Sequence, residues 1–254
     1  MRWGIASRLG ARRTWVCRGI RVRLCESSWI THYRYLTYDS KEPETLDWID
    51  RFLGGGDTFI DVGANIGLYT LYAALRHPRA RIVAIEPEYS NLHLLKENLV
   101  ANGLEQRVQV FSMALHDRRG VGHLYIQDNT PGAALHTVSD GPLHRTRAGR
   151  PVRWAEGVYM LTLDEFCEEL NLRPNAVKID VDGTEPEILA GARKTLNLPE
   201  LRSVLLELPS DRTTREASVH ALEAAGMVCS WRDTGGLSPN EVWSRGQGSY
   251  CENT

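Results

Sequence analysis

The sequence lacks the features that mark membrane-spanning, disulfide-rich and metal-binding chains. No stretch of its 254 residues approaches the roughly 18 apolar residues of a membrane span, and there is no apolar core of a secretory signal peptide. The cysteines form an odd set without a Cys-x-x-Cys pair or a metal-type spacing. We therefore predict a cytoplasmic protein whose cysteines are reduced packing or surface thiols. The cysteines are Cys17, Cys25, Cys167, Cys229 and Cys251.

Charge is present in ordinary amount but is spread unevenly. Residues 1–38 hold eight arginines and a single acid, so they carry +7, whereas the rest of the chain carries −9. A basic start of this kind is typical of a transit peptide, or of a patch for an anionic surface or substrate. The run VCRGIRVRLC alternates apolar and polar residues, which predicts a half-exposed strand and favours a folded extension over a removable peptide.

Strand and helix signals alternate from residue 58 onward, which predicts a mostly parallel sheet covered on both faces. Before this region, SKEPETLDWIDRFLGGG predicts a helix capped by Ser40 and ended by glycines. After it, GMVCSW and NEVWSR predict an antiparallel hairpin at the sheet edge. Strands are predicted at 59–62, 81–85, 108–111, 176–181 and 204–207, and helices at 68–75, 90–101, 185–196 and 216–225.

This order of signals predicts two parts. Residues 1–53 form a basic N-terminal extension, a strand plus a helix, packed on an α/β domain over residues 54–254. Between 114 and 161 the alternation stops, and turn residues and short strand-like pieces take its place. A loop of this length usually binds something or moves, so we expect residues of about 116–160 to form a substrate-facing cap. Four of the eight histidines lie there: His116, His123, His136 and His144.

The stretch FIDVGANIGLYT places an acid and two glycines where a strand passes into a helix. Such a turn, with an acid about 20 residues later, outlines an adenosine-binding site, and Glu86 at the end of the next strand can accept both ribose hydroxyls. The Gly-x-Gly-x-x-Gly signature of dinucleotide sites is missing from the turn. Asp61 would repel a pyrophosphate but attract a sulfonium, which favours S-adenosylmethionine over NAD. A plain tight turn is the alternative.

Four segments together resemble the FkbM-type methyltransferases, which depend on S-adenosylmethionine. They are FIDVGANIGLYTLYAA, VAIEPEYSNLHLLKENL, VQVFSMALHD and AVKIDVDGTEPEILAGA, in order within residues 38–210. The resemblance implies a Rossmann-like class I methyltransferase sandwich, with a mostly parallel seven-stranded sheet and an antiparallel edge hairpin. It also implies a cofactor whose ribose Glu86 holds and whose adenine packs at Met113 and Ala114. The methionine end would be held by Asp61, Gly63, Ala64, Asn65 and Gly67.

Asp180 and Asp182 stand at the carboxyl end of a predicted buried strand, where ligands of open α/β sheets bind. We predict Asp180 as the base or orienter of a methyl acceptor, with His136 or His144 as second candidates. The family usually has Glu at the position of Asp182, so a role for Asp182 that needs charge is favoured over one that needs a fixed length. Together with Glu207, these acids could hold Mg²⁺, although no spacing compels a metal site.

The resemblance implies an O-methyltransferase that acts on a hydroxyl of a small molecule or of a sugar or glycan. The chain lacks the Asn/Asp-Pro-Pro-aromatic run typical of enzymes that methylate exocyclic base amines. An NAD(P)-type oxidoreductase, an RNA methyltransferase and a non-catalytic S-adenosylmethionine-binding protein are the alternatives. Nucleic acid is a disfavoured partner because residues 39–254 are acidic and no RNA-binding module is present. The oligomeric state is left open.

Overall fold

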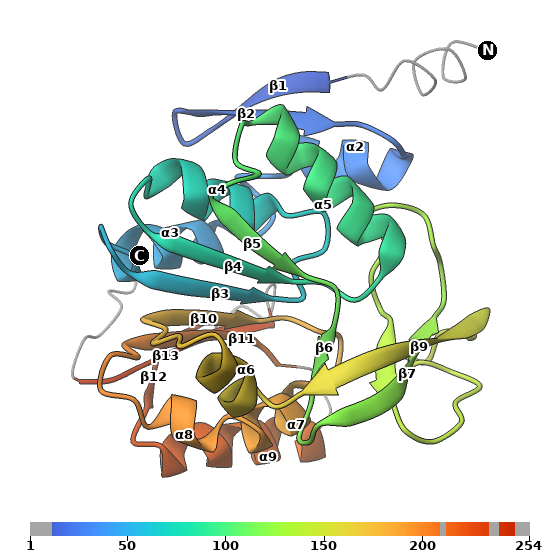
Figure 1. Cartoon of the computed structure of the whole chain (residues 1–254), viewed down its shortest axis with the longest axis vertical. Helices are drawn as coiled ribbons and strands as arrows, with labels where there is room; N and C mark the ends of the chain where they lie inside the picture. Colours follow the sequence, from blue (N-terminus) through green and yellow to red (C-terminus); the bar gives the residue numbers. More distant parts are fainter. Residues whose placement is uncertain (1–11, 209–211, 234–238, 247–254) are drawn as a thin grey trace.

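The computed structural model describes residues 12–208, 212–233 and 239–246, and it shows an α/β sandwich around a seven-stranded sheet (Figure 1). Cys251, residues 1–11 of the predicted extension and part of the loop before the last strand lie outside these ranges. The strand order is β12-β13-β11-β10-β3-β4-β5. The strands are β3 (Thr58–Val62), β4 (Arg81–Ile85), β5 (Val108–Phe111), β10 (Ala176–Ile179), β11 (Ser203–Glu207), β12 (Val228–Arg232) and β13 (Asn240–Ser244).

Neighbouring strands from β11 to β5 run parallel, whereas β13 is antiparallel to both β11 and β12. The central strands are short, mostly apolar and largely buried on both faces, as parallel strands between helices must be. The predicted fold class and the antiparallel hairpin at the sheet edge are therefore confirmed.

Successive residues of each strand point to opposite faces and build two separate cores. Phe59 and Ile82 pack on one face, with α3 (Pro43–Phe52), α4 (Leu68–Arg76) and α5 (Tyr89–Ala101). Ile60 and Val83 pack on the other face, with the later helices of the chain. Figure 1 shows these two helical layers on either side of the sheet. The later helices are α6 (Leu163–Glu169), α7 (Glu185–Ala190), α8 (Arg193–Leu196) and α9 (Arg212–Ala224).

The N-terminal segment forms a hairpin of β1 (Arg12–Cys17) and β2 (Ile20–Cys25), so the prediction of one strand is wrong. Arg18 and Gly19 have φ of 47° and 81° and make the two-residue turn that joins antiparallel strands. In one unbroken strand, Val16 and Val22 would lie on the same face, but the turn places them on opposite faces. Val22 is fully buried, whereas Val16 is 62% exposed and pairs with Arg21 on the outer face.

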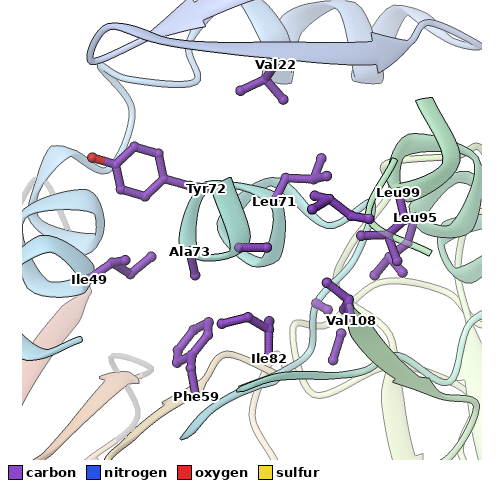
Figure 2. Packing of buried hydrophobic residues seen from close by; sticks show 14 of the residues in the cluster. Val22, Ile49, Phe59, Leu71, Tyr72, Ala73, Ile82, Leu95, Leu99 and Val108 are labelled. Atoms are coloured by element: carbon purple, nitrogen blue, oxygen red, sulfur yellow. The ribbon is translucent and has the colours of Figure 1, made fainter. Parts of the chain in front are cut away.

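This hairpin adds a layer outside the helices. Figure 2 shows α4 between the sheet and the hairpin, with Val22 of β2 above it and Phe59 and Ile82 of the sheet below it. Leu71 and Tyr72 of α4 are fully buried, because apolar layers cover the helix on both sides. An unpredicted helix, α2 (Trp29–Leu36), follows the hairpin and begins at a capping box between Ser28 and Thr31.

The interruption in the alternating pattern corresponds to a second sheet, with strand order β6-β9-β7-β8. Its strands β7 and β9 are antiparallel, and the short β6 follows β5 almost directly. Figure 1 shows this sheet beside the end of β5. Its strands are β6 (Ala114–Leu115), β7 (Gly120–Ile126), β8 (Thr137–Ser139) and β9 (Trp154–Leu161).

Two helix predictions need correction, and one further helix was not predicted. The helix expected over 185–196 is divided into α7 and α8. Gly191 ends α7 and abuts another segment: a Cβ there would lie 2.4 Å from the carbonyl oxygen of His116. Helix α3 begins after Glu42 rather than at a Ser40 cap. Helix α6 was not predicted, although Thr162 and Glu165 form its capping box. Within the described ranges, every helix is too short or too polar to cross a bilayer.

Candidate active site

A cavity of ≈ 260 Å³ lies beyond the carboxyl ends of β3, β4 and β10, where ligands of such sheets bind. A second cavity of ≈ 390 Å³ shares Leu135, Asp182 and Glu207 with it. Together they match the usual size of ligand sites, roughly 300–1,000 Å³. The predicted residues that line the first cavity are Gly63, Ala64, Asn65, Glu86, Met113, Ala114, His136, Asp180 and Asp182. Asp61, Gly67 and His144 are not among its lining residues.

The turn after β3 is fixed by its neighbours on both sides. The backbone N–H groups of Gly63 and Ala64 both donate to the carbonyl of Ile85, each at 3.0 Å. Gly63 has φ of 78°, and a Cβ at this position would lie 1.9 Å from the carbonyl oxygen of Asp180. This glycine is therefore required for the close approach of β3 and β10. Gly67, with φ of 86°, instead lets α4 pack against Leu95 of α5.

Glu86 stands at the end of β4 and faces the cavity, with its carboxylate held by backbone groups. It accepts hydrogen bonds from the N–H of Asn65 at 2.8 Å and from the N–H of Glu88 at 2.9 Å. The residue is 5% exposed, and burial raises its pKa to about 8. Hydroxyl donors from a ligand would favour the charged form of this carboxylate.

Asp61 lies below the cavity floor and acts on the site through its neighbours. It accepts a hydrogen bond from the Thr70 hydroxyl at 2.6 Å, and its Oδ1 lies 3.9 Å from the Lys178 ammonium. Burial raises the pKa of Asp61, and the charge of Lys178 opposes that shift. We therefore infer that any influence of Asp61 on a ligand is mainly electrostatic.

Lys178 is a central residue of the site that the sequence did not predict. It is 1% exposed in the middle of β10, lines the cavity, and holds the Oδ2 of Asp180 at 2.7 Å. Its ammonium also lies 5.3 Å from the centroid of the Tyr69 ring. The signal that could have revealed it is a lysine inside an otherwise apolar strand, since an ammonium is buried only when it is paired.

Asp180 and Glu207 form a pair of unequal acids beside this lysine. Burial is the largest single influence and disfavours a charged Asp180, but the charge of Lys178 and the hydrogen bonds from Glu207 and Lys178 together hold the pKa of Asp180 well below its usual range. The Asp180 carboxylate, and then burial, raise the pKa of Glu207 far above its usual range. The pair therefore presents one carboxylate and one protonated carboxyl group to the cavity.

Asp182 and Glu185 shape the turn that follows β10. Asp182 has φ of 61° and accepts a hydrogen bond from the N–H of Leu135 at 2.6 Å. Burial, and then the charge of Asp180, raise its pKa to about 6. Glu185 accepts from the N–H groups of Val181 and Gly183, at 3.2 and 3.1 Å, so it supports this turn from the start of α7.

Residues 131–135 belong to the loop between β7 and β8, and Ala134 and Leu135 of this loop line the cavity; we call the segment the strap. The side-chain amides of Asn65 and Asn91 both donate to the carbonyl of Ala133, at 2.8 and 3.0 Å. On the other side, Arg34 donates to the carbonyl of Gly132 at 2.7 Å. The strap is therefore hydrogen-bonded to the turn after β3, to α5 and to α2.

The remaining wall comes from a part of the chain that was not predicted to reach the site. Tyr69 belongs to α4 and donates its hydroxyl to the Oε2 of Glu42 at 2.7 Å. Tyr38 donates its hydroxyl to the carbonyl of Leu68. No local pattern marks these positions as ligand-facing, because only the contacts of the segment between α2 and α3 with α4 bring them there. The wall consists of Arg34, Thr37, Tyr38, Lys41 and Glu42.

The two histidine candidates are placed differently. His136 lines the cavity and is 8% exposed, whereas His144 is exposed in the loop before β9. Across the described ranges, no group of three or more histidine, cysteine or acidic side chains is arranged to hold a metal ion.

Comparison with known proteins identifies the family. The family model of the methyltransferase FkbM domain matches residues 61–222, more than half of the chain. The chain belongs to the FkbM methyltransferase family. The matched range begins at Asp61 and includes Glu86, Asp180 and Asp182, so the strand ends that surround the cavity lie within the family domain.

Two curated relatives and one solved structure are similar to this chain. The 31-O-demethyl-FK506 methyltransferase FkbM of Streptomyces tacrolimicus is 30% identical over 173 residues, which cover 60% of this chain and 65% of the relative. The AMB antimetabolite synthetase AmbE of Pseudomonas aeruginosa is 31% identical over 180 residues, 60% of this chain but 8% of the relative. The chain thus spans less than two-thirds of either protein. The crystal structure of methyltransferase FkbM from Methylobacillus flagellatus superposes with a TM-score of 0.51 at 14% identity, covering 76% of this chain and 44% of that one.

Proposed function

We propose that this methyltransferase moves a methyl group from S-adenosylmethionine to a hydroxyl of a small molecule or sugar. The observation that carries the proposal is the position of Glu86. This buried carboxylate at the end of β4 faces the cavity. Asp180 and Asp182, which follow β10, line the same cavity. Acids in these places suit an adenosine compound with a positive charge, and they repel a pyrophosphate.

The residues around the cavity fit each part of this cofactor. Glu86 offers a carboxylate to the ribose hydroxyls, and the turn at Gly63 and Asn65 lies next to it. Met113 and Ala114 follow β5 and offer an apolar surface for the adenine. When bound, S-adenosylmethionine supplies an electrophilic methyl group on a sulfonium.

The protein's own contribution would be to orient the acceptor and take up its proton. Lys178 fixes Asp180 at 2.7 Å, so this carboxylate can accept a hydrogen bond from the acceptor hydroxyl in one defined direction. The low pKa of Asp180 suits an orienting residue better than a base. Asp182, whose pKa burial raises to about 6, is closer to the working range of a general base. We therefore assign orientation to Asp180 and proton removal to Asp182.

The choice of oxygen as acceptor draws on two observations. The name of the Streptomyces tacrolimicus relative describes O-methylation of a demethylated small molecule. The turn after β10 reads DVDG, rather than the Pro-Pro-aromatic run typical of base-amine methylation. Both favour a hydroxyl.

Two measurements test the proposal. Isothermal titration with S-adenosylmethionine, S-adenosylhomocysteine and NADH should show binding of the first two and none of NADH. Incubation with methyl-labelled S-adenosylmethionine and fractions of candidate hydroxyl compounds, followed by mass spectrometry, should yield a labelled methyl ether. Tight NADH binding would favour an oxidoreductase, and labelled RNA in place of a small product would favour an RNA methyltransferase. Binding without any labelled product would point to a non-catalytic S-adenosylmethionine-binding protein.

A further inference from the structure

His136 is a buried polar side chain that has no hydrogen-bond partner among the residues that the structure describes. It is 8% exposed, and neither Nδ1 nor Nε2 has a hydrogen-bond partner among the described residues. Buried polar groups in folded proteins are nearly always paired, because an unpaired one loses its contacts with water without compensation. An unpaired imidazole that lines a cavity therefore indicates a partner that the cavity receives.

The surroundings of His136 define the shape of that partner. Leu124 and Val138 are cross-strand partners in the second sheet, and both line the cavity. Met113, which follows β5, and Leu115 of β6 line the same cavity. All four are apolar and at least nine-tenths buried. A flat apolar ring with one polar edge matches such a slot, since its faces meet aliphatic side chains and its edge meets the imidazole.

The slot lies at the adenine end of the proposed cofactor. The strap bonds to Asn65, whose own N–H binds Glu86, and His136 immediately follows the strap. Strand order then places the end of β5 beyond the end of β4, on the side away from β10. A ribose at Glu86 therefore directs its base toward Met113 and His136, while Lys178 and Asp180 lie toward the other side.

We propose that His136 recognises the base of the cofactor by accepting a hydrogen bond from the 6-amino group of adenine. The inference rests on the proposed S-adenosylmethionine site and gives this histidine a binding role in place of the expected role as a base. Burial lowers the pKa of His136 to about 4, so the imidazole is neutral and keeps one ring nitrogen free to accept. The charges that oppose this shift are those of Asp128 and Glu156, which belong to the second sheet and its loop rather than to the Asp180 group.

The test compares two ligands on three proteins. The ligands are S-adenosylhomocysteine and its 6-deamino analogue, in which purine replaces adenine. The proteins are the wild type, His136→Leu and the control His123→Leu, which changes an exposed histidine of the same sheet that does not line the cavity. Dissociation constants come from isothermal titration, and melting temperatures without ligand show whether each variant is folded.

We expect the wild type and the control to bind the deamino analogue about 5- to 50-fold more weakly than S-adenosylhomocysteine. His136→Leu should bind S-adenosylhomocysteine more weakly by a similar factor, with no further loss for the analogue. Its melting temperature without ligand should equal or exceed that of the wild type, because leucine has no unpaired polar atom to bury. Should this variant fail to fold, His136→Phe replaces it in the same comparison.

Two results would overturn the inference. Equal losses on removal of the amino group in the wild type and in His136→Leu would show that the histidine does not read that group. Unchanged affinity of His136→Leu for S-adenosylhomocysteine would show the same. Failure of the wild type to bind S-adenosylhomocysteine at all would overturn the proposed function together with this inference, so the two failures are distinguishable.

Discussion

The two ends of the cavity are built from different kinds of contact. At the first, which we call the turn end, backbone N–H groups of Asn65 and Glu88 hold Glu86. At the second, the lysine end, Lys178, Asp180 and Glu207 hold one another through their side chains. Backbone contacts follow from a local turn, so a short motif specifies them. The side-chain network instead joins separate strands, since Glu207 belongs to β11 and Lys178 of β10 also contacts Asp61 of β3. The turn end should therefore be sensitive to backbone geometry, and the lysine end to charge.

Gly63→Ala should have the largest effect, because it changes the backbone where the two ends meet. The added Cβ would lie 1.9 Å from the Asp180 carbonyl oxygen, at a positive φ of 78°. We expect the free energy of unfolding to fall by more than about 4 kcal/mol, as measured by urea denaturation. Gly157→Ala in β9 is the control: its Cβ meets no atom within 4 Å. A loss within about 1 kcal/mol for Gly63→Ala would show that the turn can move away from β10.

Lys178→Met tests the lysine end through stability. The substitution keeps an unbranched chain but leaves Asp180 and Asp61 buried without their shared cation. Removal of one partner of a buried ion pair typically lowers the free energy of unfolding by about 3–5 kcal/mol. Lys194→Met, at a side chain that is 79% exposed, should change it by less than about 0.5 kcal/mol. Equal stability of the two variants would mean that protonation of Asp180 or Asp61 compensates for the lost lysine.

Asp180→Asn tests the same end through catalysis. If Asp180 orients the acceptor hydroxyl, a neutral amide should lower the turnover number by about 10²-fold, the cost of a misplaced reactant. The dissociation constant for S-adenosylmethionine should change little, because Glu86 and the strap are untouched. Asp39→Asn, at an exposed site, is the control. Full activity of Asp180→Asn, measured as methyl product formed per minute, would move the orienting role to another residue.

Glu86→Gln tests the turn end through binding. The amide keeps the shape of the side chain but cannot offer a charged acceptor to two ribose hydroxyls. Hydrogen bonds to a charged group contribute roughly 1.5–3 kcal/mol each, so we expect the dissociation constant for S-adenosylmethionine to rise by about 10- to 100-fold. Turnover at saturating cofactor should fall much less. Glu97→Gln on the exposed side of α5 is the matched control, and similar affinities for the two variants would remove Glu86 from the site.

The sequence was sufficient to predict the turn end and the alternation of strands and helices. Asp61, Gly63, Gly67 and Glu86 lie within or directly after one strand–turn–helix–strand unit, from β3 to β4. Their spacing along the chain therefore predicts that they lie close together. The sequence did not predict the features that depend on tertiary packing. Whether Val16 or Cys17 faces inward depends on a two-residue turn, and the role of Lys178 depends on which strands flank β10. The lining by Lys41 and Glu42 depends on a contact between Glu42 and Tyr69 of α4. Asp61 was expected to touch the ligand, yet it lies below the cavity floor with Thr70 and Lys178.

Glu185→Gln gives the smallest effect and tests a position between the two ends. One oxygen of Glu185 holds the turn after β10, while Oε2 has no hydrogen-bond partner in the part of the chain that the structure describes. Burial raises the pKa of Glu185 to about 7. The folded state therefore binds a proton that the unfolded state has already lost, and stability from this group declines as pH rises from about 4.5 to 7.

An amide at this position cannot ionise and can keep the contact to Val181 and Gly183. We expect Glu185→Gln and the wild type to be equally stable near pH 4.5, and the variant to be more stable at pH 8 by about 1–3 kcal/mol. Unfolding by urea across this pH range checks the difference, with Glu105→Gln at an exposed site as the control. Parallel curves for wild type and variant would mean that Glu185 ionises in the folded protein as freely as in water. The turn after β10 would then depend on backbone geometry, like the turn end, rather than on a buried side chain.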